Sequence, residues 1–457
     1  MKGFCVASEI VDKVRQAGVV GAGGAGFPTH VKLSAQVDTV IANGAECEPL
    51  LHADQHLMMR YPELILQGLR LAMQATGAKR GIVALKGEYK QAISALKGVL
   101  GKAKDVSLHL LGSYYPAGDE FVLVHDVLGR SVPEGGIPLE VGVVVNNVGT
   151  LWNVARALEG VPVTHRYLTV TGEVRKPATL RVPIGTSIAQ VVEWAGGLSD
   201  AGRALKPEEL AFVAGGAMMG RVVQGTDVVT KTTGGLLVVP ADNPAVSWMT
   251  RPLAKAVRKG MSTCDQCRDC TDLCPRHLLG HALVPHEIMR AINYGLEAPT
   301  HIVTAAVLCC ECRLCEAYAC PLDLSPMQYY RSVKRQLAEA GWKNTVHRRK
   351  DLTLHEMFDY RRVPMRRLIA RLGLTPYQAY SVDLNEQEWT PKQVRIPLKQ
   401  HTGVPAQPAV KVGNKVKRGE LIASVPEGKL GAEVHASVAG AVREVSAQDI
   451  VIDTVNS

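Results

Sequence analysis

The chain has 457 residues, of which 46% are hydrophobic, and it carries a formal net charge of +9. A chain of this length is expected to divide into about three to five domains with enough apolar side chains to bury their cores. No apolar stretch reaches the roughly 18 to 20 residues of a membrane span, and the basic residues are not interleaved with aromatic ones as in single-strand nucleic-acid binders. The composition therefore predicts a soluble multidomain protein with no direct membrane span and no nucleic-acid partner.

A glycine-rich loop follows the first predicted helix, at residues 8–16. It contains only glycine and alanine from Gly21 to Gly26, so that Gly21, Gly23 and Gly26 satisfy the pattern G-x-G-x-x-G. A dinucleotide-binding fingerprint should follow a buried strand, whereas this loop follows a helical pattern. Either the loop is only flexible, or its uncovered backbone amides approach a phosphate or a flavin closely.

Four predicted strands come next, at residues 40–42, 82–85, 107–111 and 141–145, and helical patterns separate them. Strands that alternate with helices form a parallel sheet. Ligands bind at the carboxyl ends of the strands in such sheets. Polar loops occur at these ends, in NGAECEP from Asn43 and in NNVGT from Asn146, so we expect a ligand site there.

Four motifs in this region resemble the domain that binds FMN and NADH in the NADH-binding subunit of respiratory complex I and in the C subunit of the Rnf electron-transport complex. They are GAGGAGFPTHVK, NGAECEP, the AGDE loop and VVNNVGT, in the same order, over residues 15–155. The resemblance implies that FMN lies in a cradle of loop glycines and polar side chains, with a lysine near its phosphate. The residues concerned are Gly23, Gly24, Gly26, Lys32, Asn43, Asn146 and Asn147.

The resemblance also assigns a catalytic position beside the flavin and the nicotinamide to Glu46, Glu48 and Glu120. Two motifs depart from the family pattern. The family sequence N-A-D-E becomes N-G-A-E at residues 43–46, which loses one carboxylate, and a G-E-E loop becomes G-D-E at residues 118–120. NADH is the electron donor that the resemblance implies, and the choice between NADH and NADPH stays open.

A small β domain is predicted after the flavin domain. Alternating strands at residues 167–174 and up to Val182 precede an amphipathic helix at residues 188–195. The segment resembles the SLBB-type β-grasp domain that follows the flavin domain in the same families, and it is expected to act as a spacer. Met218 and Met219 are interpreted as core or interface filler, because methionine adapts to irregular gaps.

Nine of the eleven cysteines lie between residues 264 and 320. The first run is C-x2-C-x2-C-x3-C-P, the spacing by which bacterial ferredoxins hold two [4Fe-4S] clusters, with three thiolates from one loop and the fourth from the other run. The alternative, structural zinc, seldom uses a third cysteine two residues on or a proline after the fourth. We therefore predict one cluster on Cys264, Cys267, Cys270 and Cys320, and a second on Cys309, Cys312, Cys315 and Cys274.

The second cysteine run departs from the ferredoxin pattern. Four residues, not three, separate Cys315 from Cys320, and Cys310 is an additional thiol. The choice between Cys309 and Cys310 as a ligand therefore stays open, with Cys310 as the expected spare.

Two regions follow the cysteines. Residues 343–371 are rich in arginine and lysine and predict a solvated helical linker. Residues 399–452 show short strands broken by glycines and resemble the barrel-sandwich hybrid of lipoyl and biotinyl carriers. Lys429 lies roughly where a carrier lysine would sit, but its neighbours lack the usual carrier sequence, so an unmodified docking barrel is the preferred interpretation.

The domain order resembles that of the cobalamin reductases of propanediol-utilisation microcompartments. In the C subunit of the Rnf complex the barrel precedes the flavin domain, whereas here it follows the cysteines. The resemblance implies an oxidoreductase that passes electrons from NADH through FMN and two [4Fe-4S] clusters to cob(III)alamin or cob(II)alamin, for coenzyme B12 regeneration. It implies a corrinoid adenosyltransferase and microcompartment proteins as partners, and a cytoplasmic location inside a bacterial microcompartment.

The sequence itself marks no corrin site. Residues 54–59 approach the D-x-H-x-x-G motif of base-off cobalamin proteins but lack its glycine, so His56 is interpreted as an ordinary polar residue. Two alternatives therefore remain. The chain could be the C subunit of an Rnf-type electron-transport complex, or a non-catalytic electron-carrier or docking module.

The predicted fold class is multidomain α/β and α+β. We expect an FMN/NADH-binding α/β domain at residues 1–160, an SLBB-like β-grasp domain at 161–250, a ferredoxin-type helical domain with two clusters at 251–345, a basic helical linker at 346–392 and an all-β barrel-sandwich hybrid at 393–457.

Overall fold

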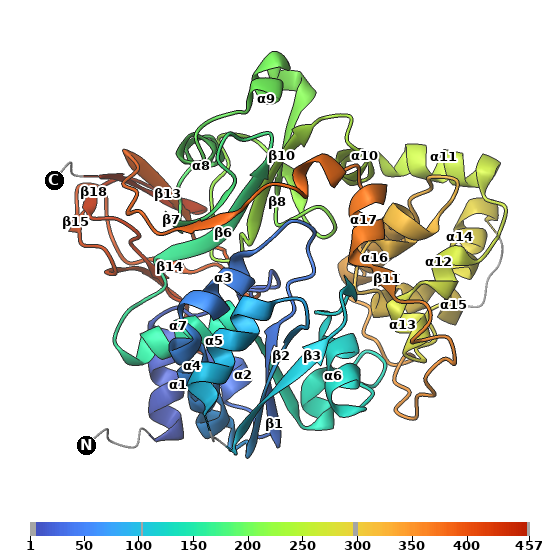
Figure 1. Cartoon of the computed structure of the whole chain (residues 1–457), viewed down its shortest axis with the longest axis horizontal. Helices are drawn as coiled ribbons and strands as arrows, with labels where there is room; N and C mark the ends of the chain where they lie inside the picture. Colours follow the sequence, from blue (N-terminus) through green and yellow to red (C-terminus); the bar gives the residue numbers. More distant parts are fainter. Residues whose placement is uncertain (1–5, 102–103, 296–299, 455–457) are drawn as a thin grey trace.

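The computed structural model describes residues 6–101, 104–295 and 300–454. Figure 1 shows an α/β domain in blue, a β-rich domain in green above it, a helical domain in yellow on one side and an all-β domain in red on the other. The segment that links the helical and all-β domains is orange and crosses the green domain. None of the helices in the described ranges has the length and apolar character needed to cross a membrane.

The α/β domain is built on a parallel sheet whose order is β3 (Val106–Leu111), β2 (Arg80–Lys86), β1 (Thr39–Gly44) and β5 (Val143–Asn147). Successive strand residues point to opposite faces. Val40 and Ala42 therefore share a buried cluster with one set of helices, whereas Ile41 packs with the other face. The first face is covered by α1 (Ala7–Gln16), α4 (Pro62–Thr76), α5 (Lys90–Leu100) and α7 (Val148–Leu158), and the second by α6 (Glu120–Leu128). The predicted parallel sheet is confirmed.

The strand order places a topological switch point between β1 and β5. The chain runs from β1 outward to β2 and β3, and then returns to add β5 on the opposite side of β1. In open α/β sheets, ligands bind outside the carboxyl ends of the strands at such a point. Smaller elements of this domain are α2 (Thr29–Leu33), α3 (Ala53–Arg60), β4 (Tyr114–Tyr115) and the 3-10 turn η1 (Pro138–Val141), which precedes β5 at the amino edge of the sheet.

The β-rich domain contains a mixed six-stranded sheet. Val191 and Val192 of its helix α8 (Ile188–Trp194) pack onto this sheet. Met218 is fully buried where this domain meets its neighbours, whereas Met219 is 59% exposed, so only Met218 acts as filler. The strand order is β12 (Asp383–Asn385), β7 (Ala178–Pro183), β6 (His165–Gly172), β10 (Gly235–Pro240), β8 (Leu210–Ala214) and β9 (Arg221–Val223), and α9 (Asp200–Ala204) and η2 (Pro207–Glu209) lie between α8 and β8.

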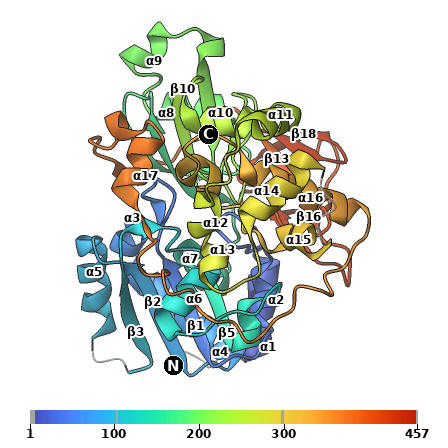
Figure 2. The same cartoon turned by 90° about the vertical axis from the view of Figure 1, so that its right-hand side faces the viewer.

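The helical domain packs around the buried side chains of Tyr329 and Tyr330 and carries both cysteine runs. Figure 2 views the molecule from this side, and α13 lies next to α6 of the α/β domain in Figures 1 and 2. The elements are α10 (Pro244–Thr250), α11 (Leu253–Thr263), α12 (Asp269–Asp272), α13 (Pro275–Leu278), α14 (Pro285–Tyr294), α15 (Thr300–Thr304), η3 (Ala305–Leu308), the π-helix η4 (Cys315–Ala319) and α16 (Pro326–Glu339).

The linker at 346–392 corrects one expectation, because it is only partly helical. It contains β11 (Val363–Pro364), which pairs with β4, then α17 (Met365–Arg371), the 3-10 turn η5 (Thr375–Tyr377) and β12, which joins the six-stranded sheet. Proline lacks a backbone donor and fixes φ, so Pro364, Pro376 and Pro391 limit helix length. Apolar residues such as Phe358 and Leu368 are buried against the other domains. The linker is therefore a folded segment that packs against the other domains.

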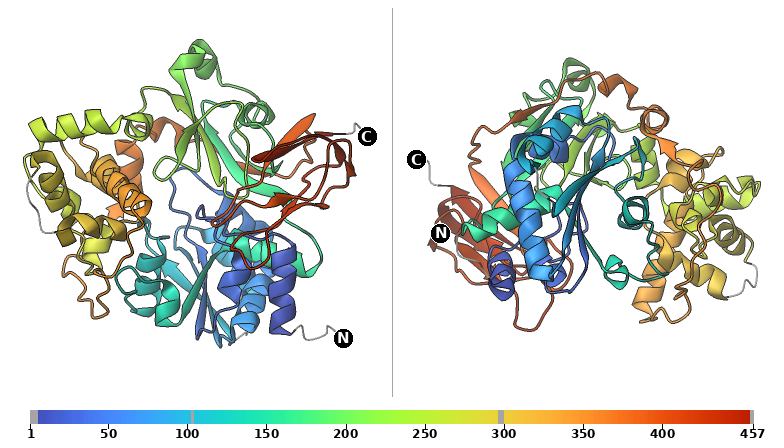
Figure 3. Two further views of the ribbon diagram at one scale, coloured as in Figure 1. Left: turned by 180° about the vertical axis from the view of Figure 1, so that it is seen from behind. Right: turned by 60° about the horizontal axis from the view of Figure 1, so that its bottom comes forward.

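The C-terminal domain consists of two small antiparallel sheets, as the sequence predicts for a barrel-sandwich hybrid. Figure 3 shows it packed beside the α/β domain, and the two domains share one buried cluster. Lys429 lies in an exposed turn. One sheet contains β13 (Gln393–Pro397), β19 (Asp449–Thr454), β18 (Gly440–Val445) and β15 (Lys415–Val416), and the other contains β14 (Gln407–Pro408), β16 (Leu421–Ser424) and β17 (Val434–His435).

Candidate flavin and iron-sulfur sites

The glycine-rich loop lies over the beginning of α7, at the switch point of the sheet. The Ala22 amide donates a hydrogen bond to Thr150 Oγ1 at 2.8 Å. A β-carbon on Gly23 would lie 3.6 Å from Asn147 Cβ, and one on Gly24, whose φ is +112°, would meet nothing within 4 Å. The loop therefore presents bare backbone at a helix N-terminus, which is suited to a phosphate or a flavin.

The three predicted asparagines meet at the same edge. Asn43 and Asn147 are paired residues of β1 and β5, and Asn147 Oδ1 accepts from the Gly149 amide to cap α7. Asn146 is only 4% exposed, and its Nδ2 has no hydrogen-bond partner among the residues described. Because buried donors are nearly always paired, this orphan fits a bound group with acceptor atoms. The residues present therefore fit FMN.

Lys32 and Glu120 come together beside this edge. Lys32 Nζ donates to Glu120 Oε1 at 2.9 Å and to the carbonyl oxygen of Val145, near the end of β5, at 3.0 Å. The lysine thus lies at the edge of the sheet, and the family resemblance implies an FMN phosphate near it. Whether it contacts a phosphate stays a prediction.

Glu46 belongs to a buried polar network at the switch point. Its Oε2 accepts from the Asp54 amide at 3.0 Å, and Asp54 Oδ2 accepts from Asn147 Nδ2 at 2.6 Å. Arg166 of β6 donates to the carbonyl oxygens of Ala22 and Thr233. Burial and the Asp54 carboxyl raise the pKa of Glu46, and burial raises the pKa of Asp54, while the Arg166 guanidinium opposes both shifts. The network can therefore retain a proton beside the site.

Glu48 is the one predicted acidic residue whose carboxylate turns toward another domain. Met218 N donates to its Oε2 at 2.9 Å and Met219 N to its Oε1 at 2.7 Å. Burial raises the pKa of Glu48 to about 7, although the two amides and Arg313 lower it. Its predicted contact with the nicotinamide stays a prediction.

Sequence reasoning missed Asp54 and Arg166 as site residues. The only signal for Asp54 was its place in a D-x-H pattern, where His56 instead contacts Thr179 Oγ1 at 2.8 Å. Arg166 lies in a strand of the next domain, so no local pattern links it to Ala22, which is 144 residues away.

Three cysteines of the first run and one distant cysteine line one cavity. The four cysteines are Cys264, Cys267, Cys270 and Cys320. All come from the helical domain, and Cys267 is exposed. This is the set that the ferredoxin spacing predicts for one cluster.

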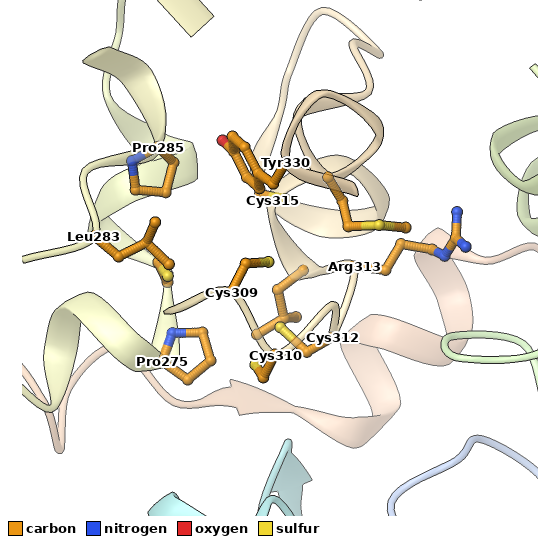
Figure 4. Close-up of a pocket in the computed structure, with 12 residues that line it drawn as sticks. Pro275, Leu283, Pro285, Cys309, Cys310, Cys312, Arg313, Cys315 and Tyr330 are labelled. Atoms are coloured by element: carbon orange, nitrogen blue, oxygen red, sulfur yellow. The ribbon is translucent and has the colours of Figure 1, made fainter. Parts of the chain in front are cut away.

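A second cavity contains the other predicted set together with the spare thiol (Figure 4). It is lined by Cys274 from the first run and by Cys309, Cys310, Cys312 and Cys315 from the second. Arg313 extends away from the cysteines in Figure 4. None of the ten cysteines in the described ranges forms a disulfide, and no three His, Cys, Asp or Glu side chains there are placed to hold a single metal ion.

The two cysteine loops repeat the same backbone conformation. Gln266 and Arg268 have φ values of +60° and +73°, and Glu311 and Arg313 have +58° and +64°. Positive φ is costly for residues other than glycine and recurs here at equivalent positions. The repeat aligns Cys309 with Cys264, which favours Cys309 over Cys310 as the ligand.

The π-helix η4 accounts for the irregular spacing before Cys320. The first run passes from its third to its fourth cysteine through α12, whereas the second does so through η4. A π-turn accommodates one extra residue relative to an α-turn. The additional residue therefore leaves the three-cysteine loop intact.

The second cavity borders the α/β domain through two buried contacts. Arg276, next to Pro275 in α13, forms two hydrogen bonds with Asp119 at 2.6 and 2.9 Å. Tyr115 donates from its hydroxyl to the Cys312 carbonyl oxygen at 2.9 Å. Both α/β residues belong to the loop that also holds Gly118, whose carbonyl oxygen accepts from Asn43 Nδ2. We call the carboxyl edge of the sheet, where the three asparagines meet, the flavin edge. Direct contacts thus join the flavin edge to the second cavity.

The C-terminal domain closes over the glycine-rich loop. Thr402 donates from its amide to the Gly26 carbonyl oxygen and from its hydroxyl to the Ala25 carbonyl oxygen, both at 3.0 Å. Lys231, from the β-rich domain, donates to the carbonyl oxygens of Gly18 and Glu433 at 2.7 and 2.6 Å. Three domains therefore meet at this loop.

Comparison with known families accounts for most of the chain. The Nuo51 FMN-binding domain matches residues 14–156, the SLBB domain 167–222, the 4Fe-4S dicluster domain 263–325 and the RnfC barrel sandwich hybrid domain 378–455. The fold and the sites thus define a multidomain protein that binds FMN and two [4Fe-4S] clusters. The predicted fold class and cofactors are confirmed, whereas the boundaries predicted between the domains stay predictions.

Two curated relatives resemble the chain over nearly its whole length. The cobalamin reductases PduS of Salmonella typhimurium and Citrobacter freundii are each 45% identical to it, and each alignment covers 98% of this chain and 96% of the relative. The C subunit of the Na(+)-translocating ferredoxin:NAD(+) oxidoreductase complex of Acetobacterium woodii is 38% identical over 60% of this chain and 59% of its own length. The chain belongs to the PduS cobalamin reductase family.

Proposed function

We propose that this chain is an NADH-dependent cobalamin reductase that takes electrons from NADH and delivers them to cob(III)alamin or cob(II)alamin. Bound FMN supplies the conversion between two-electron hydride chemistry and one-electron transfer, which the clusters and the corrin cobalt require. The 45% identity to two cobalamin reductases PduS supports this acceptor.

The observation that carries the proposal is the direct junction between the flavin edge and the second cysteine cavity. Asp119 and Arg276 join the two within a buried ion pair, and the same loop reaches Asn43 through Gly118. A protein that only stored iron-sulfur clusters would have no need to connect them to a flavin-binding edge. The junction therefore favours electron transfer within one chain.

The residues have distinct roles in this proposal. Gly23 and Gly24 give the flavin access to bare backbone, whereas Gly26 lets the loop pass beneath Thr232 and the C-terminal domain. Lys32 offers a positive charge, and Asn43, Asn146 and Asn147 orient the ring. Glu46, with Asp54, can hold a proton beside the nicotinamide, and Glu120 places there a carboxylate that is paired with Lys32. The clusters are held by Cys264, Cys267, Cys270 and Cys320, and by Cys309, Cys312, Cys315 and Cys274.

The proposed partners follow from the same family. A corrinoid adenosyltransferase would receive the reduced corrin for coenzyme B12 regeneration, and microcompartment proteins would enclose both enzymes in the cytoplasm. Cofractionation with shell proteins and with the adenosyltransferase tests this placement. Recovery with the membrane fraction would instead support the electron-transport role named for the Acetobacterium relative.

The decisive experiment is anaerobic purification with iron, sulfide and flavin analysis, followed by titration with NADH under optical and EPR observation. About eight irons and one FMN per chain are expected, both reducible by NADH and reoxidised by hydroxocobalamin. Reduction of hydroxocobalamin no faster than by free reduced flavin would refute the reductase. If NADH cannot reduce the clusters, the enzyme hypothesis is refuted and the interpretation as a docking module is left.

A further inference from the structure

Glu48 is held by a preformed hairpin of the β-rich domain. The hairpin joins β8 to β9, and its consecutive Met218 and Met219 amides donate one to each carboxylate oxygen of Glu48. Gly216, at φ +110°, has no room for a side chain, because its β-carbon would lie 2.4 Å from Glu48 Oε2. Successive amides that converge on one carboxylate form an anion-binding nest.

The opposite side of the hairpin contacts the loop of the second cysteine cavity. Arg313, which lies between Cys312 and Cys315, donates from Nε to the Met218 carbonyl oxygen at 2.7 Å. The Arg313 guanidinium also pairs with Glu316 at 2.5 Å, and both side chains are buried. A continuous chain of hydrogen bonds therefore runs from the polar loop after β1, through one peptide of the hairpin, to the cysteine loop.

We propose that Glu48 is a positioning residue that fixes the loop of the second cysteine cavity relative to the flavin edge, through the hairpin between β8 and β9. The inference rests on the proposed function, since positioning matters only where electrons pass between these two places. It gives the β-rich domain a role beyond that of a spacer. Both carboxylate oxygens are engaged by amides, so Glu48 has no oxygen free of the hairpin.

The first test measures the contact itself in the purified holoprotein by hydrogen exchange of peptides that cover residues 214–220. Glu48→Gln keeps the shape but offers one acceptor oxygen in place of two, so exchange at Met218 or Met219 should accelerate roughly tenfold or more. Gly216→Ala should do the same with Glu48 intact, by displacing the hairpin. Unchanged protection in both variants would overturn the proposal.

The second test separates positioning from catalysis by rapid mixing with NADH. In Glu48→Gln, the rate of flavin bleaching should stay within about twofold, whereas the later appearance of the cluster EPR signals should slow roughly tenfold. Slower bleaching or weaker NADH binding, with an unchanged later phase, would overturn the proposal and return Glu48 to the nicotinamide site. No change in either phase would overturn it as well.

Two further variants serve as controls. Glu63→Gln, at an exposed position in the first turn of α4, should leave both the exchange and the kinetics unchanged. Glu48→Asp retains the charge on a shorter side chain and should recover only part of the cluster phase, whereas an effect of charge alone would predict full recovery. If NADH fails to reduce the flavin of the unmodified protein, the proposed function fails, while hydrogen exchange still decides whether Glu48 holds the hairpin.

Discussion

The ion pair between Asp119 and Arg276 should hold the flavin edge against the second cysteine cavity. Their side chains are only 14% and 7% exposed, and two hydrogen bonds join them. Asp119 also caps α6 by accepting from the Phe121 and Val122 amides. Removing one member of a buried pair leaves an uncompensated charge and costs about 3 to 5 kcal/mol. Asp119→Asn keeps a capping oxygen, so most of its cost should come from the stranded guanidinium.

A double-mutant cycle measures this energy. Asp119→Asn, Arg276→Met and the double variant should give a coupling free energy of about 3 kcal/mol in urea unfolding of the anaerobically prepared protein. The exposed pair Arg70 and Asp105 supplies the matched control, for which the same cycle should give less than about 1 kcal/mol. A coupling at the buried pair no larger than at this control would refute the reasoning.

The same pair should respond to acid in a defined direction. Burial alone would raise the pKa of Asp119, but Arg276 and the two capping amides bring it below its ordinary value. A carboxyl whose folded pKa is lowered contributes stability above its unfolded pKa and loses it as the pH falls through the folded pKa. The stability difference between the unmodified protein and Asp119→Asn should therefore be constant near neutral pH and shrink below about pH 4.

Three further predictions concern separate parts of the molecule. Burial lowers the pKa of Lys231 to about 7, whereas the amine of the unfolded chain stays protonated to about pH 10. The free energy of unfolding should therefore rise with pH between these two values, because the unfolded state binds more protons there. Lys231→Met should abolish that rise in urea unfolding. Cys320→Ser should alter the EPR signal of the cluster in the first cavity alone. Cys310→Ala should leave about eight irons per chain. Loss of both clusters in either variant would contradict the ligand sets. Gly68→Ala should lower the melting temperature by several degrees, because its β-carbon would lie 1.9 Å from the Leu151 carbonyl oxygen, and an unchanged melting curve would contradict the close packing of α4 and α7.

The parts of the site that the sequence predicts are those that depend on local spacing. The asparagines at the ends of β1 and β5 meet because parallel strands share one carboxyl edge. Cys320 lies with three cysteines of the first run because, in the ferredoxin pattern, the fourth ligand of each cluster comes from the other cysteine run. Both patterns can be recognised within a few residues, so the fold class, the flavin edge and the crossed cysteine sets could be predicted from the amino-acid sequence alone.

The parts that escaped prediction are contacts between domains. Glu48 meets Met218 across 170 residues, and Arg166 meets Ala22 across 144. Neither contact leaves a periodic pattern, because each depends on how separate cores pack against one another. The prediction of a solvated helical linker was wrong for a related reason. The charges of this segment suggested a solvated helix, whereas its residues Phe358 and Val363 are buried against the α/β domain and its neighbours.

The contact between Thr402 and the glycine-rich loop has a consequence for biosynthesis. The two sides of the hydrogen bond to Ala25 are 377 residues apart. At roughly 5 to 20 residues per second, the ribosome needs about 20 to 75 s to pass from one to the other. The α/β domain can fold during that time with its loop uncovered, and the barrel can close over the loop only after Thr402 has been synthesised. Flavin therefore has a period of open access to a folded cradle before the barrel is in place.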